Sequence, residues 1–265
     1  MSCPSPQMVS AVAKSPKRKT AIHRMLGSNI PAKGGNVRIG KDVVFGQGVV
    51  LHDFVTIESN TVIGPYVVIG EPLVDSYKSS DYSNPRTVIG RNSVIRSGTI
   101  IYAGCRLGQG TTTGHYAVIR ERTTCGEDCS FGTFATSDGD VKIGDRCRFH
   151  YYAHVCKKAK IGDDIRMFPR SMLLNDTHPP CGRCLQGPEI SDRVVIGSAA
   201  TIAPKVKVGQ DALIAAMSMV TKDVPAGMVV MGVPAKVVGK ASDIECKTGL
   251  LNHPYPWNKQ YIRPR

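Results

Sequence analysis

Aliphatic side chains recur along the chain every six positions, and this spacing is its strongest pattern. From Val37 the sequence reads VRIGKD, VVFGQG, VVLHDF, VTIESN, TVIGPY and VVIGEP, and from Thr87 it resumes with TVIGRN, SVIRSG and TIIYAG. Each unit places a small or β-branched residue four positions after the aliphatic one. A period of six does not fit the 3.6-residue period of an α-helix, and the hairpin turns of an antiparallel fold do not alternate with the units. The pattern therefore predicts a solenoid of short strands.

Two positions of each unit are expected to face the interior. Residues i and i+2 of a strand point to the same side, and a corner containing glycine or asparagine separates consecutive strands. The predicted interior aliphatic positions are Ile39, Ile63, Ile89, Ile143, Ile161 and Ile196. The small residue four positions later is predicted to lie beside them in the interior, as at Val43, Val67, Ser93 and Cys147.

This pattern resembles the repeats of hexapeptide-repeat proteins, and the resemblance covers residues 37–224 with two interruptions. It implies an all-β fold, a left-handed parallel β-helix with three short sheets and about 18 residues per coil. The left-handed crossover is taken from the resemblance alone, because most parallel crossovers are right-handed. Residues 18 apart should then stack on successive coils at about 4.8 Å, so that Cys129 lies against Cys147.

Two interruptions of the repeat are predicted to be loops that leave the solenoid. They span residues 71–86 and 176–193, and both are polar and contain proline. Because a regular solenoid has no pocket of its own, we expect function at these loops or between subunits. The chain then divides into a basic N-terminal arm predicted to be disordered (1–36), the β-helix (37–239) and a C-terminal cap with a short helix at SDIECKTGLL (240–265).

The C-terminal part of the repeat contains the predicted donor site. After Val224 the segment PAGMVVMGVPAKVVG resembles the end of the hexapeptide acyltransferases, where it closes the last coil and helps to bind coenzyme A. The resemblance implies acetyl-CoA as the acyl donor. Small outward residues leave room for a pantetheine arm, lysines offer cations to the phosphates, and proline gives an apolar surface to adenine. The predicted residues are Ala203, Ala215, Ala216, Lys222, Pro234 and Lys236.

Among the seven histidines, His115 is the predicted general base. A neutral imidazole is the commonest side chain that accepts a proton from a nucleophile. The segment TTTGHYAVIRER resembles the coil on which related acyltransferases keep such a base, and His115 takes a turn position from which its ring projects. Glu121 is a weaker candidate for orienting a catalytic group. The alternative interpretation of His115 is an exposed turn residue.

The second interruption supplies the predicted acceptor site. Its text NDTHP resembles the "NDxHP" segment of sugar N-acetyltransferases, which implies that Asn175, Asp176 and His178 contact the substrate. Cys181 and Cys184 form a lone Cys-x-x-Cys, and a structural zinc site needs four ligands. A redox motif needs a βαβ context that is missing here. We therefore interpret these cysteines as structural or incidental.

A zinc site is also considered at His115, His150 and His154. Some hexapeptide-repeat proteins are carbonic anhydrases that hold zinc with three histidines across a subunit interface. Their His-x4-His spacing is absent here, where the spacing is x3, and the three histidines occupy different positions of the repeat. No metal is predicted.

Composition and charge limit the classes of binding partner that are expected. The net charge is +13, but +6 of it lies in residues 1–36 and +3 in residues 240–265, so that the predicted solenoid is only mildly basic. The sequence contains no basic stripe with interleaved aromatic residues, so nucleic-acid binding is not predicted. No apolar run approaches the roughly 18 residues of a membrane span, and the Pro-, Ser- and Lys-rich N-terminus does not have the pattern of a secretory signal. Most of the nine cysteines are spread along the body, so a reduced, cytoplasmic protein is expected.

Together these features predict an acyl-CoA-dependent N-acyltransferase that acetylates an amino group of an amino sugar, with nucleotide-linked sugars among the candidates. The resemblance implies a homotrimer with active sites between subunits. Three alternatives stay open: an O-acetyltransferase acting on a sugar or antibiotic hydroxyl, a zinc-dependent carbonic-anhydrase-like protein, and a non-catalytic scaffold.

Overall fold

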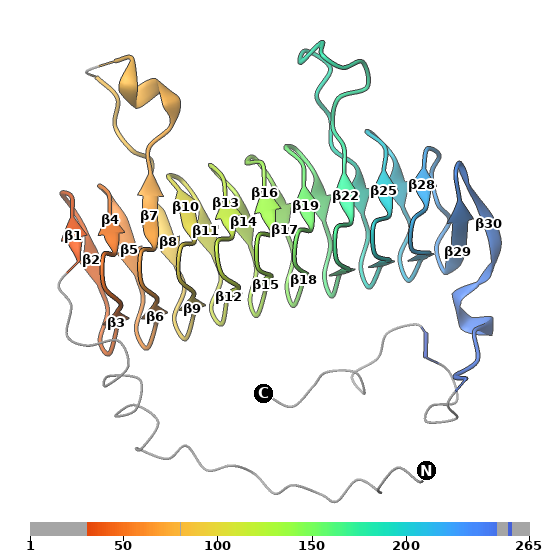
Figure 1. Ribbon diagram of the computed structural model, residues 1–265, viewed down its shortest axis with the longest axis horizontal. Coiled ribbons are helices and arrows are strands. Elements are labelled where there is room, and N and C mark those ends of the chain that lie inside the picture. Colours follow the sequence, from red (N-terminus) through yellow and green to blue (C-terminus); the bar gives the residue numbers. More distant parts are fainter. Residues whose placement is uncertain (1–30, 80, 248–253, 256–265) are drawn as a thin grey trace, which may run out of the picture.

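Each six-residue unit forms a short strand followed by a corner, and three units complete one coil of a β-solenoid (Figure 1). The computed structural model describes residues 31–79, 81–247 and 254–255. Strands three apart in the chain pair in parallel, which builds three parallel sheets along the axis. The predicted all-β, left-handed parallel β-helix is confirmed. The predicted disorder of the arm falls on residues 1–30, which lie outside the described part.

The three sheets share no strand. The ten-stranded sheet contains β1 (Ala32–Lys33), β4 (Val50–Leu51), β7 (Val68–Glu71), β10 (Ile100–Tyr102), β13 (Val118–Ile119), β16 (Thr136–Ser137), β19 (His154–Val155), β22 (Met172–Leu173), β25 (Thr201–Ile202) and β28 (Met219–Val220). The nine-stranded sheet contains β2 (Arg38–Ile39), β5 (Val55–Ile57), β8 (Thr87–Ile89), β11 (Arg106–Leu107), β14 (Thr124–Cys125), β17 (Lys142–Ile143), β20 (Lys160–Ile161), β23 (Glu189–Ile190) and β26 (Lys207–Val208). The eleven-stranded sheet contains β3 (Val44–Phe45), β6 (Val62–Ile63), β9 (Val94–Ile95), β12 (Thr112–Thr113), β15 (Ser130–Phe131), β18 (Arg148–Phe149), β21 (Arg166–Met167), β24 (Val195–Ile196), β27 (Leu213–Ile214), β29 (Met228–Gly232) and β30 (Ala235–Lys240).

The core is a column of side chains from all three sheets, as the repeat predicts. The predicted aliphatic positions from Ile63 onward are buried, and so are the small residues beside them. Ile39 is the exception, with 41% of its surface exposed. Its strand β2 ends the nine-stranded sheet, so no earlier coil of that sheet covers it. Val43 is likewise only partly buried at this end.

Three corners connect the sheets, and we name each for what it contains. The loop corner leads from the ten-stranded to the nine-stranded sheet, and both long loops leave the solenoid there (Figure 1). The aspartate corner leads from the nine-stranded to the eleven-stranded sheet. The aromatic corner leads from the eleven-stranded back to the ten-stranded sheet.

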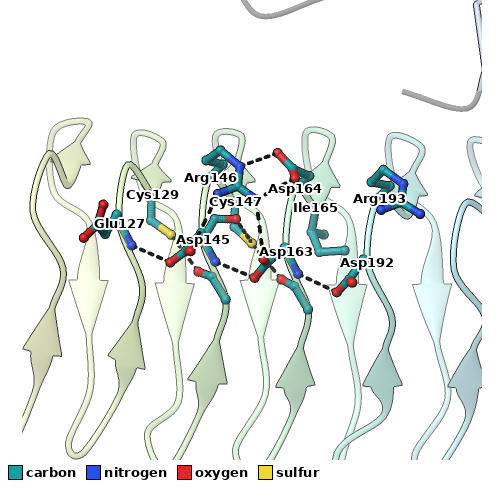
Figure 2. Close-up of polar contacts among 12 residues, drawn as sticks. Glu127, Cys129, Asp145, Arg146, Cys147, Asp163, Asp164, Ile165, Asp192 and Arg193 are labelled. Carbon is teal, nitrogen blue, oxygen red and sulfur yellow. Dashed lines mark hydrogen bonds and ion pairs between the residues drawn. The ribbon is translucent and has the colours of Figure 1, made fainter. Parts of the chain in front are cut away.

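The aspartate corner shows how the coils are joined (Figure 2). The Asp145 carboxylate accepts the Glu127 N–H at 2.8 Å, the Asp163 carboxylate accepts the Asp145 N–H at 2.9 Å, and the Asp192 carboxylate accepts the Asp163 N–H at 2.9 Å. Arg146 adds ion pairs to the next coil, with its Nη2 2.9 Å from Asp164. Cys129 and Cys147 lie buried one coil apart at this corner, as predicted.

The first loop covers residues 72–86 and includes the 3₁₀ turn η1 (Val74–Tyr77). The second loop covers residues 174–188, and here the predicted segment 176–193 was wrong at its C-terminal boundary. Strand β23 lies inside that segment and pairs with β20 and β26. Ile190 takes the interior position, but Pro188 and Ser191 stand where other units carry a small residue and glycine, which hid the unit in the sequence.

The C-terminal end closes with an antiparallel pair rather than the predicted helix. Strands β29 and β30 pair antiparallel around a turn at residues 232–235. One 3₁₀ turn, η2 (Ala241–Asp243), follows, and residues 244–247 are not helical. Residues 248–253 and 256–265, which include the rest of the predicted cap, lie outside the described part. In the described residues, no helix is both long and apolar enough to cross a bilayer.

Candidate active site

The predicted base His115 lies on the aromatic corner, in the turn between β12 and β13. Its side chain is exposed, and among the described residues its imidazole has no hydrogen bond or ion pair. The next residue begins a ladder of exposed rings: Tyr116 stacks on Phe134 at 5.5 Å between ring centroids, and Phe134 stacks on Tyr152 at 5.1 Å. Arg170 extends the ladder over the Tyr152 ring. His115 therefore borders an apolar ridge and has no group that orients its ring.

Glu121 does not lie near His115, because it occupies the loop corner. Its side chain is only 6% exposed. The Arg120 guanidinium contacts its carboxylate at 3.1 Å, and the Lys157 ammonium lies 3.7 Å away. Gly139 of the next coil, at φ +91°, packs over it, and a Cβ there would lie 3.0 Å from the Glu121 carboxyl carbon. The carboxylate is thus a buried anchor for two cations.

A second ion-pair group continues this corner. Arg122 holds Asp140 through two hydrogen bonds of 2.5 and 2.9 Å, and the Lys157 ammonium lies 3.1 Å from the same carboxylate. The Arg122 hydrogen bond is the main reason that the pKa of Asp140 falls to about 2; burial opposes the shift, and Lys157 adds to it.

A cavity of about 360 Å³ lies beneath the first loop at this corner. A volume near the low end of ligand pockets, roughly 300–1,000 Å³, suits a small polar ligand. The first loop supplies apolar and acidic walls, and the coils supply Tyr102, three cations and Glu121. The loop is held at its base by the Asn84 amide, which donates 2.8 Å to the Gly70 carbonyl. The lining residues are Glu71, Pro72, Leu73, Val74, Asp75, Tyr77, Tyr102, Arg120, Glu121, Arg122 and Lys157.

Three polar side chains in mutual contact lie on the coils beside this cavity. His154 Nδ1 is 2.8 Å from the Thr136 hydroxyl, and His154 Nε2 is 3.4 Å from an Asp138 carboxylate oxygen. The hydrogen bond with His154 lowers the pKa of Asp138; partial burial opposes this, and the charges of Arg120 and Lys157 support it. The His154 side chain keeps 28% of its surface exposed, so a ligand can approach it.

The predicted acceptor residues lie on the same corner, one coil further on. The Asn175 side-chain amide donates 3.4 Å to the Lys157 carbonyl. The Asp176 carboxylate turns back into its own loop and accepts the N–H groups of His178 and Gly182 at 3.0 and 3.1 Å. His178, Cys181 and Cys184 are exposed in the same loop. The structure thus brings Asn175 next to the cavity wall and leaves His115 on a different corner.

The predicted donor residues lie on two corners and on the closing hairpin. Ala203 and Lys222 belong to the loop corner, whereas Ala215 and Ala216 belong to the aromatic corner. Pro234 and Lys236 lie at the turn of the β29–β30 pair. Lys222 and Lys236 are both exposed, and within the described part of the chain neither forms an ion pair.

The three histidines of the zinc alternative do not converge. His150 stacks on Phe168 at 4.8 Å, His154 faces Asp138, and His115 lies on the aromatic corner. Burial is the main cause that lowers the pKa of His150, with the charges of Arg148 and Arg166. Across residues 31–79, 81–247 and 254–255, no group of three or more His, Cys, Asp or Glu side chains is arranged to hold a metal ion.

Comparison with known proteins agrees with the repeat and the fold. Residues 36–71 and 86–121 match the family model described as bacterial transferase hexapeptide, six repeats. Over these two segments the repeat of this chain is similar to the repeat of that family. A solved structure, the Arabidopsis UDP-N-acetylglucosamine acyltransferase, matches this chain with a TM-score of 0.59 and 18% identity, over 79% of this chain and 72% of that chain. At 18% identity, this structural similarity shows only that the two proteins share a fold.

One set of curated relatives has a higher sequence identity to this chain than that structure has, but the aligned segment is shorter. The 2,3,4,5-tetrahydropyridine-2,6-dicarboxylate N-acetyltransferase of Staphylococcus aureus is 39% identical over 84 residues, which are 32% of this chain and 34% of the relative. The chain therefore spans about a third of the length of the curated relatives that it matches.

Sequence reasoning missed Thr136, Asp138 and Lys157, and considered His154 only as a metal ligand. A signal for this group exists in the register of the repeat. Thr136 and His154 are 18 positions apart, and so are the members of the series Glu121, Gly139, Lys157 and Asn175. Written in rows of 18, the sequence places Thr136 beside His154 in the ten-stranded sheet, and it places Glu121, Lys157 and Asn175 in one column at the loop corner.

Proposed function

We propose that this protein is an acyl-CoA-dependent N-acyltransferase, with acetyl-CoA as donor and an amino group of an amino sugar as acceptor. The observation that carries the proposal is the 84-residue match, at 39% identity, to a relative named as an N-acetyltransferase. The reaction needs a surface for the donor and a pocket for the acceptor. A proton acceptor beside that pocket completes the machinery.

The donor is assigned to the C-terminal coils through the residues predicted from the sequence. Lys222 and Lys236 are exposed cations without a partner in the described part, as phosphate binding requires. Ala203 and Ala215 lie on different corners, so one coenzyme cannot lie against both within one chain. Two adjacent copies satisfy both contacts, which supports the homotrimer as part of the proposal. Light scattering coupled to size-exclusion chromatography tests that state directly.

The acceptor is assigned to the loop corner. The cavity beneath the first loop presents carboxylates that attract an amine, cations that attract a phosphate or carboxylate, and tyrosine rings against which a sugar ring packs. Asn175 borders the same wall through Lys157. An amino sugar, free or nucleotide-linked, combines these features in one small molecule. His115 stays the base that is predicted from the sequence.

The decisive experiment incubates the purified full-length protein with acetyl-CoA and a panel of free, UDP-, dTDP- and GDP-linked amino sugars. Each is paired with the matching sugar that carries a hydroxyl in place of the amine. Free CoA and acetylated product are separated by chromatography, because thiol reagents would also react with the exposed Cys181 and Cys184. Amine-dependent CoA release supports the proposal. Turnover only with the hydroxyl sugars would indicate O-acetylation instead, and no acceptor-dependent release at all would refute acyl transfer.

The donor site is tested by the double variant Lys222→Ala/Lys236→Ala. Loss of two exposed ion pairs of up to about 1 kcal/mol each should raise the KM for acetyl-CoA about tenfold, with little change in the KM for the acceptor. The control is Lys142→Ala, which removes an exposed lysine from β17 on the nine-stranded sheet. An unchanged KM for acetyl-CoA in the double variant would place the donor elsewhere.

A further inference from the structure

We propose that Thr136, His154 and Asp138 form a proton relay that serves an acceptor amine bound in the cavity beneath the first loop. The inference rests on the proposed acyl transfer and assigns its proton acceptor to His154 rather than to His115. Three independent features of the structure carry it: the geometry of the three side chains, the position of their coils beside the cavity, and their distance along the axis from the donor residues.

The geometry gives each member of the chain one role. A carboxylate only accepts hydrogen bonds, so the His154 Nε2 that faces Asp138 carries the proton. Nδ1 then has a free lone pair and accepts the Thr136 hydroxyl proton at 2.8 Å. Asp138 therefore orients the ring, His154 is the base, and Thr136 presents an oxygen beyond it. A base with both an orienting group and a hydroxyl in hydrogen-bond reach is the arrangement that proton transfer requires. The imidazole of His115 has neither in the described structure.

The coil that carries Thr136 and Asp138 is flanked by residues that line the cavity. Arg120 belongs to the preceding coil and Lys157 to the following one, and both line the cavity. Thr136 is paired in register with Val118 on one side and with His154 on the other. Thr136, Asp138 and His154 are not themselves among the lining residues, so the relay lies beside the cavity, next to Arg120 and Lys157.

Along the axis, His154 lies closer than His115 to the predicted donor residues. Strand β19, which begins at His154, is three strands from β28 in the ten-stranded sheet, whereas β13 beside His115 is five strands away. At about 4.8 Å per strand, these separations are about 14 and 24 Å. A donor whose phosphates lie near Lys222, and whose pantetheine arm extends along the axis, therefore reaches the coil of His154 before that of His115.

The step balances without any other reactant. The acceptor nitrogen attacks the thioester carbonyl carbon, so an N–C bond forms and the C–S bond breaks. The nitrogen releases one proton to Thr136 Oγ1 while the Thr136 hydroxyl proton moves to His154 Nδ1. The imidazolium is stabilised by Asp138, and it returns a proton through the same hydroxyl to the departing thiolate. The products are the amide and CoA.

The test is steady-state kinetics of purified full-length variants with acetyl-CoA and the amino sugar that the wild type acetylates. His154→Ala should lower kcat by about 10² to 10⁴, the usual contribution of a general base. Thr136→Val keeps the shape of the side chain but removes the hydroxyl, and it should lower kcat at least tenfold. Thr136→Ser restores the hydroxyl and should stay within about threefold of the wild type. All three variants should keep the wild-type KM for acetyl-CoA and the wild-type melting temperature.

Asp138 is tested as a positioning residue. Asp138→Asn should lower kcat and leave the KM for acetyl-CoA unchanged, whereas a merely structural role would change the melting temperature instead. His115→Ala tests the competing assignment of the base, and the relay requires that His154→Ala lowers kcat more than His115→Ala does. For the cavity, Tyr102→Ala should raise the KM for the acceptor about tenfold, and its control is Tyr66→Ala, an exposed ring away from the cavity.

The outcomes separate this inference from the proposed function. If the wild type turns over and Thr136→Val equals Thr136→Ser, or if His115→Ala alone abolishes turnover, the relay is refuted and acyl transfer stands. If His154→Ala unfolds, His154→Gln takes its place, and full activity in that variant refutes the relay as well. If the wild type acetylates no amine, the proposed function fails and the relay fails with it.

Discussion

Replacing Gly144 by alanine should destabilise the solenoid, because this glycine lies where two coils touch at the aspartate corner. An ideal Cβ at Gly144 would overlap the Asp163 carboxylate and lie 2.8 Å from the carbonyl carbon and oxygen of Gly162. The carboxylate can move, but the backbone of the next coil cannot move cheaply. Overpacking of this kind costs about 1–3 kcal/mol. A displaced Asp163 also loses the 2.9 Å hydrogen bond from the Asp145 N–H, which is worth roughly 1 kcal/mol.

The free energy of unfolding of Gly144→Ala should therefore be about 3 kcal/mol lower than that of the wild type. Urea unfolding followed by far-UV circular dichroism measures it. The matched control is Gly239→Ala, because nothing lies within 4 Å of a Cβ at that position. Its stability should stay within about 0.5 kcal/mol of the wild type or rise slightly. Equal midpoints for the two variants would refute the idea that glycine is needed at this corner for inter-coil contact.

Three other outcomes follow from buried or paired groups. Phe149→Ala removes a buried ring that stacks on Phe131 at 5.0 Å, so the free energy of unfolding should fall by about 3–5 kcal/mol in a urea titration. The depressed pKa of Asp140, about 2, stabilises the folded state above the unfolded value near 3.8, and this contribution is lost as the pH falls through 2. Asp140→Asn should therefore flatten the decline of the melting temperature between about pH 4 and pH 2, and an unchanged decline would contradict the pairing with Arg122. A thiol reagent should modify Cys181 and Cys184 rapidly in the native protein, and a Cys181→Ser/Cys184→Ser variant should lose two fast-reacting thiols. The buried thiols should react only after denaturation. Burial helps to raise the pKa of three of them, Cys105, Cys129 and Cys156, to about 12.

The fold could be predicted from the sequence because one local rule is repeated in every unit. The rule is an interior aliphatic residue, a corner and a small residue, and together they determine the strand, the turn and the register. The strand of an ambiguous unit can therefore be assigned from the neighbouring units. The rule failed where a unit departs from it. Ser191 replaces the usual glycine in the unit that contains Ile190, and the strand there was assigned to the loop. The C-terminal hairpin was missed because its strands β29 and β30 follow no six-residue rule.

The candidate site was harder to predict because its residues meet between coils and not along the chain. The His154–Thr136 hydrogen bond joins positions 18 apart, and the Asn175–Lys157 contact does the same. Motif resemblance selects residues one segment at a time, so it found Asn175 and missed the partner beside it. The cavity depends on a further fact that no motif contains, namely that the first loop folds back over the coils that follow it.

The spacing of the two loops indicates that they serve different parts of the proposed reaction. They leave the ten-stranded sheet at β7 and β22, five strands apart, and both project from the same corner (Figure 1). At about 4.8 Å per strand, their bases are about 24 Å apart, a span longer than one sugar. The first loop closes the cavity that is assigned to the acceptor. The second loop leaves one coil after His154, between the proposed relay and the coil of Lys222. A donor that extends from Lys222 to Thr136 must pass the base of the second loop, where Asn175 already contacts Lys157. Under the proposed function, the first loop selects the acceptor, and the second loop guides the acyl group to it.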